Sequence, residues 1–312
     1  TAYIFNNTEH AANLFGLKEF GNIYSRLGNP TVGALEARLT ALEEGAMCVA
    51  LSSGTSAVMY SLINIMSQGD NFVTANQLYG GTYTMFDNIL PEYGINSKKV
   101  DITNLKAVEA AIDEKTRAIY CETITNPGLV VADISALADI AHSKGIPLIV
   151  DATFTTSAIL KPFEYGADIV VYSLTKWMSG HGRVIAGAVI EKGGFDWGNG
   201  NFPLYDKPDT SYGGMRWGHD LGDLGNVAYS LRLRTVPLRN LGANMSPDTA
   251  FEVMSGLETL ALRMERHCEN AIKAAEYLTK HDLVEWVRFP GLKDDPAYDL
   301  SEKYLKGTGG TM

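Results

Sequence analysis

Short apolar segments with strand character alternate with helical patterns along most of the chain, and glycines mark several of the junctions. The apolar segments expected to form strands are 47–51, 72–75, 118–121, 146–150, 169–172 and 184–190. The patterns expected to form helices are 31–44, the stretch from 55 to about 66, 82–90, 104–115 and 133–143. Such alternation predicts an α/β fold with a mostly parallel sheet between layers of helices.

Two polar residues follow neighbouring strands of this predicted sheet. Asp151 ends the strand at 146–150, and Lys176 comes shortly after the strand at 169–172. Because ligands of open α/β sheets bind at the carboxyl ends of the strands, we expect both side chains to line one crevice. A lysine and a carboxylate that can pair with a pyridinium nitrogen are what a pyridoxal phosphate (PLP) site requires. Taken alone, Lys176 is better explained as a surface lysine that follows a strand.

Small residues at a helix start predict an anion site. Ser53, Gly54 and Thr55 connect a strand to a helix, where free backbone N–H groups and the helix dipole attract a phosphate. Ser173 and Thr175 are placed to add hydroxyl donors. A plain helix cap is the alternative, and the P-loop signature Gly-Lys-Ser/Thr is not found here.

Three further residues carry weaker signals. Tyr79 precedes two glycines and a helix start, so it could stack on a pyridine ring or belong to a turn. Asn126 follows the strand at 118–121 and is expected at the same sheet edge as Asp151. Arg26 lies in an irregular segment, where it could pair with a phosphate or be a surface arginine.

In order and spacing these motifs resemble those of the Cys/Met-metabolism PLP-dependent enzymes, over essentially the whole chain. The motifs are Tyr24-Ser25-Arg26-x-Gly28-Asn29-Pro30-Thr31, Ser52-Ser53-Gly54-Thr55-Ser56-Ala57, Tyr79-Gly80-Gly81-Thr82, Glu122-x-x-x-Asn126-Pro127, Val150-Asp151-x-Thr153-Phe154 and Ser173-Leu174-Thr175-Lys176. The resemblance implies fold type I of the PLP-dependent transferases (aspartate-aminotransferase-like), with a small C-terminal α/β domain.

The resemblance also assigns roles. It makes Lys176 the Schiff-base lysine, Asp151 the partner of the pyridinium nitrogen and Tyr79 the ring-stacking residue, with Asn126 near the phenolic oxygen of the ring. The residues expected to hold the phosphate are Ser53, Gly54, Thr55, Ser173 and Thr175.

Two residues of the N-terminal segment are expected to act across a subunit boundary. The resemblance implies that Tyr24 and Arg26 reach the phosphate in the neighbouring subunit, so that a dimer shares its active sites and the assembly is a homotetramer. Catalytic roles are implied for Lys176, Asp151, and Tyr79 or the partner's Tyr24 as an acid or base.

A long irregular segment indicates which group of enzymes within the family the chain resembles most. Residues 193–225 form an insertion that resembles the O-acetylhomoserine sulfhydrylases, and Gly81 stands where methionine γ-lyases carry cysteine. The resemblance therefore implies conversion of O-acetyl-L-homoserine and sulfide, or a thiol, to L-homocysteine, or methionine, and acetate. Cystathionine γ-synthase, cystathionine γ-lyase and methionine γ-lyase chemistry are the alternatives. Ala152 and Arg183 depart from the residues common in the family.

The expected organisation has three parts: an intersubunit arm at 1–30, a PLP-binding domain at 31–250, and a bridging helix with the start of a C-terminal domain at 251–312. One long helical pattern runs from Ser246 to about His281, and residues 307–312 have the character of a strand start. We expect residues to be missing at both ends. The family's substrate-carboxylate arginine lies in the C-terminal part, so no residue is assigned that role.

Composition limits the partners. A net charge of −10 argues against a general nucleic-acid surface, and no apolar run is long enough to span a bilayer. Cys48, Cys121 and Cys268 lack metal-ligand spacing, so we expect no metal site, buried thiols and a cytoplasmic enzyme. Two rival classes lack their signatures: the serine–lysine penicillin-recognising enzymes their Ser-Asp-Asn and Lys-Thr-Gly motifs, and dinucleotide-binding domains their Gly-x-Gly-x-x-Gly motif.

Overall fold

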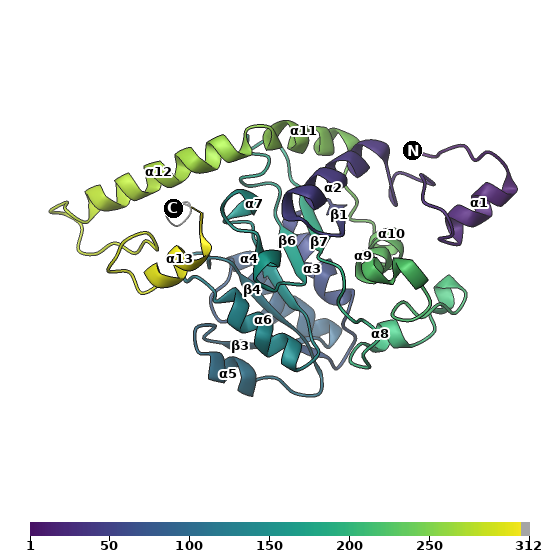
Figure 1. Ribbon diagram of the computed structural model, residues 1–312, viewed down its shortest axis with the longest axis horizontal. Helices are drawn as coiled ribbons and strands as arrows, with labels where there is room; N and C mark the ends of the chain where they lie inside the picture. The colour runs from purple at the N-terminus through teal and green to yellow at the C-terminus, as the bar shows by residue number, and fades with distance from the viewer. Residues whose placement is uncertain (307–312) are drawn as a thin grey trace.

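The computed structural model describes residues 1–306, and a single seven-stranded sheet lies at its centre (Figure 1). The strands are β1 (Met47–Leu51), β2 (Asn71–Ala75), β3 (Asn96–Val100), β4 (Thr116–Glu122), β5 (Leu148–Asp151), β6 (Ile169–Tyr172) and β7 (Gly187–Glu191). Their order is β1-β7-β6-β5-β4-β2-β3. Strands β6, β5, β4, β2 and β3 pair in parallel, whereas β7 is antiparallel to both β1 and β6. The predicted mostly parallel α/β sheet is confirmed.

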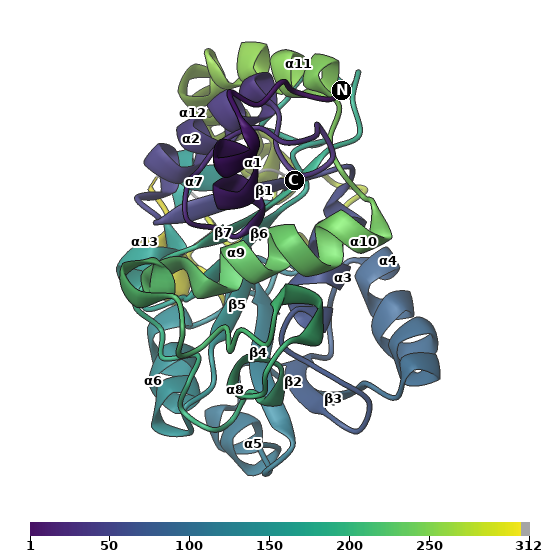
Figure 2. The ribbon, with the colours of Figure 1, turned by 90° about the vertical axis from the view of Figure 1, so that its right-hand side faces the viewer.

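Helices flank the sheet. In Figure 2, α6 and α13 lie on one side of the strands and α3 and α4 on the other. The helices are α1 (Thr8–Phe15), α2 (Pro30–Glu43), α3 (Gly54–Ile63), α4 (Gly80–Thr84), α5 (Leu105–Ala110), α6 (Ile134–Ser143), α7 (Thr156–Ile159), α8 (Pro203–Asp206), α9 (Ala228–Leu233), α10 (Arg239–Leu241), α11 (Pro247–Leu257), α12 (Leu260–Leu278) and α13 (Tyr298–Tyr304). None of those within residues 1–306 combines the length and apolar character needed to cross a membrane.

Local sequence sets where several helices begin. The side chain of Asn29 accepts a hydrogen bond from the Thr31 amide at 3.0 Å, and Pro30 occupies the first position of α2. Asp133 caps α6 and Ser246 caps α11 in the same way. These side chains satisfy amide groups that lack a partner within the first helical turn, which fixes the helix starts.

The central strands are buried on both faces. All seven residues of β4 are buried, and β6 is likewise buried throughout. Parallel strands covered by helices on both faces need such continuous apolar runs. One large apolar core includes these strands, and a separate small cluster of Ala271, Ala275 and Phe289 lies at the C-terminal half of α12.

Several elements differ from the sequence expectations. Strand β3 was not predicted, because its Asn-Ser-Lys-Lys-Val sequence carries no apolar pattern and it lies at the sheet edge. The long helix expected from Ser246 is two helices, α11 and α12, separated at residues 258–259. The helix expected at 82–90 is α4 followed by a wider π-helical turn, Met85–Ile89. The strand start expected at 307–312 lies outside the described residues.

The insertion at 193–225 contains short turns packed around aromatic side chains. The Trp197 ring stacks on Tyr205 and on Tyr229 of α9, with 5.1 Å between ring centroids in each pair. Glu191, at the end of β7, accepts hydrogen bonds from Trp197 Nε1 at 3.2 Å and from the Ser230 amide at 2.9 Å. The segment is therefore an ordered excursion whose buried aromatic side chains join the main core, although it has no helical or strand period.

Candidate active site

Asp151 and Lys176 line one cavity of ≈ 700 Å³ at the carboxyl ends of the parallel strands. Strands β5 and β6 are parallel neighbours, and Asp151 pairs in register with Val171. The crevice predicted from the sequence is therefore present. Nine of the eleven predicted site residues line it: Ser53, Gly54, Thr55, Tyr79, Asn126, Asp151, Ser173, Thr175 and Lys176.

The Asp151 carboxyl group is held by hydrogen bonds from two directions. Its Oδ1 accepts from the Thr153 amide at 2.9 Å, and its Oδ2 accepts from the Tyr120 hydroxyl at 3.3 Å. Burial raises the pKa of Asp151, since desolvation disfavours the charged form. A cation in the cavity would favour the ionised carboxylate, and a protonated pyridine nitrogen is such a cation.

The segment that contains Lys176, residues 173–178, is called the lysine segment and is held by hydrogen bonds on two sides. Thr153, just after β5, accepts a hydrogen bond on Oγ1 from the Ser173 amide at 2.7 Å. On the other side, the Arg263 guanidinium of α12 donates to the carbonyl groups of Trp177 at 2.7 Å and Met178 at 3.4 Å. Lys176 itself is exposed toward the cavity. The backbone around the amine is thus fixed while the amine remains accessible.

The N-terminus of α3 approaches the lysine segment closely because glycine is present at two points. A Cβ on Gly54 would lie 2.5 Å from Cβ of Ser173, and a Cβ on Gly187 would lie 2.1 Å from the Ser53 carbonyl oxygen. Ser53 caps the helix by accepting from the Ser56 amide at 3.0 Å. A ten-residue helix therefore directs its positive end at the cavity.

The two predicted hydroxyl groups differ in their present partners. Thr175 Oγ1 donates to the Ala186 carbonyl oxygen at 3.1 Å and accepts from the Ala186 amide at 2.9 Å. The Thr175 hydroxyl hydrogen is therefore used by the backbone of the segment before β7. Ser173 packs directly against Gly54, at the helix start. Of the two, Ser173 is the better placed to donate to an anion at this helix end.

Tyr79 and Asn126 are held by a residue whose role was not predicted. Glu122, the last residue of β4, accepts from the Tyr79 amide on Oε1 at 2.7 Å and from the Asn126 amide on Oε2 at 2.9 Å. Burial, and then the nearby Asp151, raise the pKa of Glu122 to about 8. Gly81 leaves room for the Tyr79 ring, since a Cβ there would lie 2.7 Å from Tyr79 Cε1.

The remaining two predicted residues, Tyr24 and Arg26, do not line this chain's own cavity. The Arg26 guanidinium lies over the Tyr24 ring, 5.4 Å from its centroid, and donates to the Arg239 carbonyl oxygen. Figure 1 shows α1, in the N-terminal segment, at the opposite end of the molecule from the C-terminal end of α12. Within the described residues of one chain, Tyr24 and Arg26 are not part of the cavity lining to which the other nine belong.

The departures from the family pattern are also visible. Ala152 is fully buried, and its amide donates to the Val171 carbonyl oxygen at 3.0 Å. Arg183 is exposed, and its guanidinium lies 3.5 Å from the Glu252 carboxylate of α11. Arg183 does not line the cavity, although its neighbour Gly182 does.

Comparisons with known proteins agree with this geometry. The family model described as Cys/Met metabolism PLP-dependent enzyme matches residues 1–312. The chain belongs to this family. The O-acetyl-L-homoserine sulfhydrylase of Leptospira meyeri is 45% identical over 309 residues, which are 97% of this chain and 70% of that protein. The homocysteine synthase of Schizosaccharomyces pombe is 44% identical over 315 residues, covering 100% of this chain and 73% of that protein.

A solved structure has the same fold. A Campylobacter jejuni protein assigned as an O-acetylhomoserine (thiol)-lyase, whose structure contains N'-pyridoxyl-lysine-5'-monophosphate, superimposes with a TM-score of 0.94. The two sequences are 39% identical, and the matched region covers 98% of this chain and 75% of the Campylobacter jejuni chain. The chain is thus a PLP-dependent enzyme of fold type I.

The residues present fit this cofactor. The absence of a Cβ on Gly54 lets the positive end of α3 lie directly against Ser173, and both line the cavity. A helix end of this kind suits a phosphate. The half-buried carboxyl group of Asp151, which lines the cavity, suits a pyridinium nitrogen. Lys176, exposed in the same cavity, supplies the primary amine that binds an aldehyde covalently.

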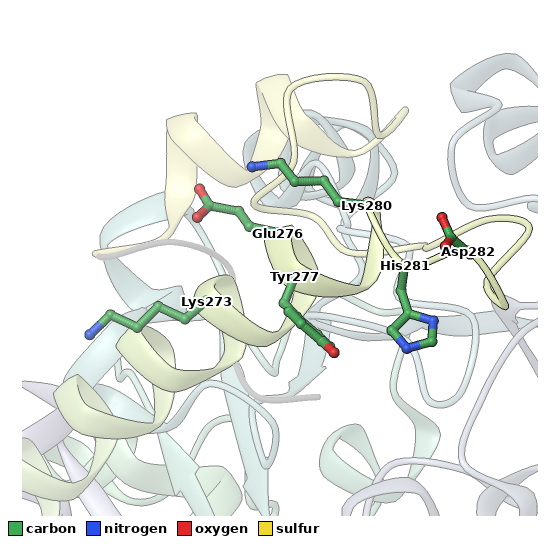
Figure 3. A pocket seen from close by; sticks show the side chains of 6 residues that line it. All are labelled: Lys273, Glu276, Tyr277, Lys280, His281 and Asp282. Carbon is green, nitrogen blue, oxygen red and sulfur yellow. The ribbon is translucent and has the colours of Figure 1, made fainter.

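A second hollow, of ≈ 430 Å³, lies at the far end of α12 (Figure 3). The side chains that line it are Lys273, Glu276, Tyr277, Lys280, His281 and Asp282. Figure 3 shows that they point in different directions from one helix end and do not converge on a common point. The hollow therefore lacks the arrangement of a catalytic site.

Several residues of the site carried no predicted role. Glu122 lines the cavity, and Tyr120, two residues earlier on β4, is fully buried and donates a hydrogen bond to Asp151. Side chains two apart along a strand point to the same face, so this spacing was the available signal for a pair at the Asp151 edge. His267, which reaches the cavity from α12 and contacts the Trp177 ring, had no such signal.

Proposed function

We propose that the protein exchanges the acetoxy group of O-acetyl-L-homoserine for sulfide or a thiol. In the overall reaction the Cγ–O bond breaks, a Cγ–S bond forms, and the products are L-homocysteine (or methionine, from methanethiol) and acetate. The observation that carries the proposal is the placement of Asp151 and Lys176 at adjacent strand ends in one cavity. The sulfhydrylase and homocysteine synthase relatives support the choice of substrate.

Bound PLP would draw electrons from the carbon framework of an attached amino acid. Lys176 Nζ would anchor the cofactor and, once displaced by the substrate amine, move protons at Cα and Cβ. The Asp151 carboxylate would hold the proton on the pyridine nitrogen, in a charge-assisted hydrogen bond worth about 1.5–3 kcal/mol. Tyr79 would stack on the ring, and its hydroxyl would serve as an acid or base.

Phosphate and ring oxygen would be bound by the remaining residues. The amides at the start of α3, with Ser53, Gly54 and Thr55, would hold the phosphate together with Ser173. Thr175 would join them by turning its hydroxyl hydrogen from the Ala186 carbonyl oxygen to the phosphate. Asn126 would donate to the phenolic oxygen of the ring. The positive end of the helix supports the phosphate assignment, since it stabilises an anion without a lysine.

We also propose that active sites are shared in a dimer, with a tetramer as the complete assembly. Tyr24 and Arg26 of one subunit would reach the phosphate of its partner, and the fact that neither lines this chain's own cavity supports that assignment. Mixing Arg26→Ala and Lys176→Ala subunits tests it. Mixed dimers then contain one intact site, so about a quarter of wild-type activity should return. No recovery on mixing would contradict shared sites.

Supplying the purified protein with PLP, O-acetyl-L-homoserine and sulfide tests the reaction. Homocysteine and acetate should appear in equal amounts, and Lys176→Ala should abolish both. Cleavage of cystathionine or methionine without homocysteine formation from the ester would instead assign the alternative chemistry of the family. A cytoplasmic location and the three-part domain division remain predictions.

A further inference from the structure

Glu122 connects two loops that are distant in sequence. Its Oε1 lies 2.7 Å from the amide nitrogen of Tyr79, which precedes it by 43 residues, and its Oε2 lies 2.9 Å from the amide nitrogen of Asn126. Each carboxyl oxygen therefore accepts one backbone N–H from a different loop. Tyr79 and Asn126 both line the cavity, as Glu122 does.

The Glu122 side chain is buried, with an exposed fraction of 5%. It forms no ion pair within residues 1–306, and its neighbour in register on β5 is another carboxyl group, Asp151. A buried carboxyl group without a cation depends on its hydrogen-bond donors. Movement of either loop would leave one oxygen unsatisfied, so the carboxyl group resists any change in the spacing of the two loops.

We propose that Glu122 is a positioning residue, whose carboxyl group binds the Tyr79 and Asn126 amides and thereby sets the gap into which the PLP ring fits. The proposal rests on the roles given above to Tyr79 and Asn126. It deepens them, because it explains how two loops that share no helix or strand hold a fixed separation. Direct contact between Glu122 and substrate is not required.

The test is Glu122→Gln, which keeps the shape of the side chain but replaces one acceptor oxygen with an NH₂ group. That group faces a backbone N–H and cannot bond to it, so one of the two loops should be released. Hydrogen–deuterium exchange of the purified protein, with and without added PLP, should show the Tyr79 or the Asn126 amide exchanging about tenfold faster. The dissociation constant for PLP, measured from its absorbance, should rise about tenfold.

Glu191→Gln is the matched control. Glu191 is also buried and also accepts two hydrogen bonds, from Trp197 and Ser230, but it does not line the cavity. It should leave amide exchange at Tyr79 and Asn126, and the PLP dissociation constant, unchanged. The proposal is overturned if Glu122→Gln changes neither quantity, or if Glu191→Gln changes both to the same extent.

These readouts do not depend on the acceptor used by the enzyme. Absence of homocysteine formation in the wild-type protein would defeat the proposed reaction. Faster exchange and weaker PLP binding in Glu122→Gln would still support the positioning role. The reverse pattern is normal homocysteine formation by the wild-type protein, with unchanged amide exchange and PLP binding in Glu122→Gln. It would contradict the positioning role of Glu122 and still support the proposed reaction.

Discussion

Two pairs of carboxyl groups in this molecule share a raised pKa but lie in different surroundings. Glu122 and Asp151 end strands β4 and β5 and line the cavity. Glu43 and Glu191, at the ends of α2 and β7, are enclosed by protein. Burial raises the pKa of all four, to about 8 for Glu122 and about 7 for both Glu43 and Glu191.

The difference lies in what each carboxyl group faces. Glu43 accepts from the Tyr172 hydroxyl, and Glu191 from the Trp197 indole and the Ser230 amide, so both are enclosed by groups of the core. Asp151 and Glu122 face space that a ligand can enter. A raised pKa alone therefore marks burial, and only its combination with an open cavity marks a site for chemistry.

The largest effect should come from Asp151→Asn. An amide cannot hold a protonated pyridine nitrogen through a charge-assisted bond, so kcat/KM for homocysteine formation should fall by about 10²–10³-fold. Thermal unfolding should change little, because the asparagine oxygen can still accept from the Thr153 amide. Steady-state kinetics beside a melting curve checks both. A near-normal kcat/KM for Asp151→Asn would contradict the claim that the carboxyl groups facing the cavity, unlike those enclosed in the core, take part in the chemistry.

A different signature is expected for Glu191→Gln. The folded state keeps the Glu191 proton up to about pH 7, whereas the unfolded chain releases it near 4.5, so folding takes up a proton between these values. The contribution of Glu191 to stability is therefore complete below pH 4.5 and is lost as the pH rises through about 7.

Glu191→Gln lacks this titration. Urea unfolding of both proteins at about pH 5 and about pH 8 should show the wild type losing up to about 3 kcal/mol more than the variant between the two. Activity per folded molecule should be unchanged. An equal pH dependence in both proteins would show that Glu191 does not titrate in this range.

Gly54→Ala should have a smaller effect, confined to the cavity. A Cβ at this position would meet Ser173 Cβ at 2.5 Å, so α3 or the lysine segment must shift. Overpacking of this kind costs about 1–3 kcal/mol. We expect PLP binding to weaken about tenfold, measured by titration of the protein with PLP. Unchanged affinity would place the phosphate elsewhere.

Gly33→Ala, within α2, is its control and should have the smallest effect. A Cβ there would meet no atom within 4 Å. Alanine should therefore stabilise the helix by about 0.5–1 kcal/mol, without a change in PLP affinity. A destabilised protein in the melting experiment would contradict the open space described at this position.

The location of the cavity could be predicted from the sequence, because parallel strands bring their carboxyl ends together. Asp151 and Lys176 each follow an apolar run, so their neighbourhood was predictable from the strand pattern alone. The positioning role of Glu122 was not, because the partners of its carboxyl group are backbone amides, and these carry no sequence signal. Identity as a PLP enzyme came from motif resemblance more than from any single residue.

The missed elements have local reasons. Strand β3 is polar, half-exposed and held at the sheet edge by β2 alone, so it lacks the apolar pattern that reveals a strand. The break between α11 and α12 leaves the helical spacing of apolar residues largely intact on both sides, so periodicity did not reveal it. The arm residues Tyr24 and Arg26 were predicted for a partner's site, which a single chain does not contain.

Reductive trapping tests the central claim most directly. The PLP-loaded protein would be treated with borohydride, digested and examined by mass spectrometry. We predict a pyridoxyl phosphate group on the peptide that contains Lys176, at about one per chain, and none in Lys176→Ala. A modified peptide from another lysine, or no modification in a protein that binds PLP, would contradict the assignment of this cavity as the active site.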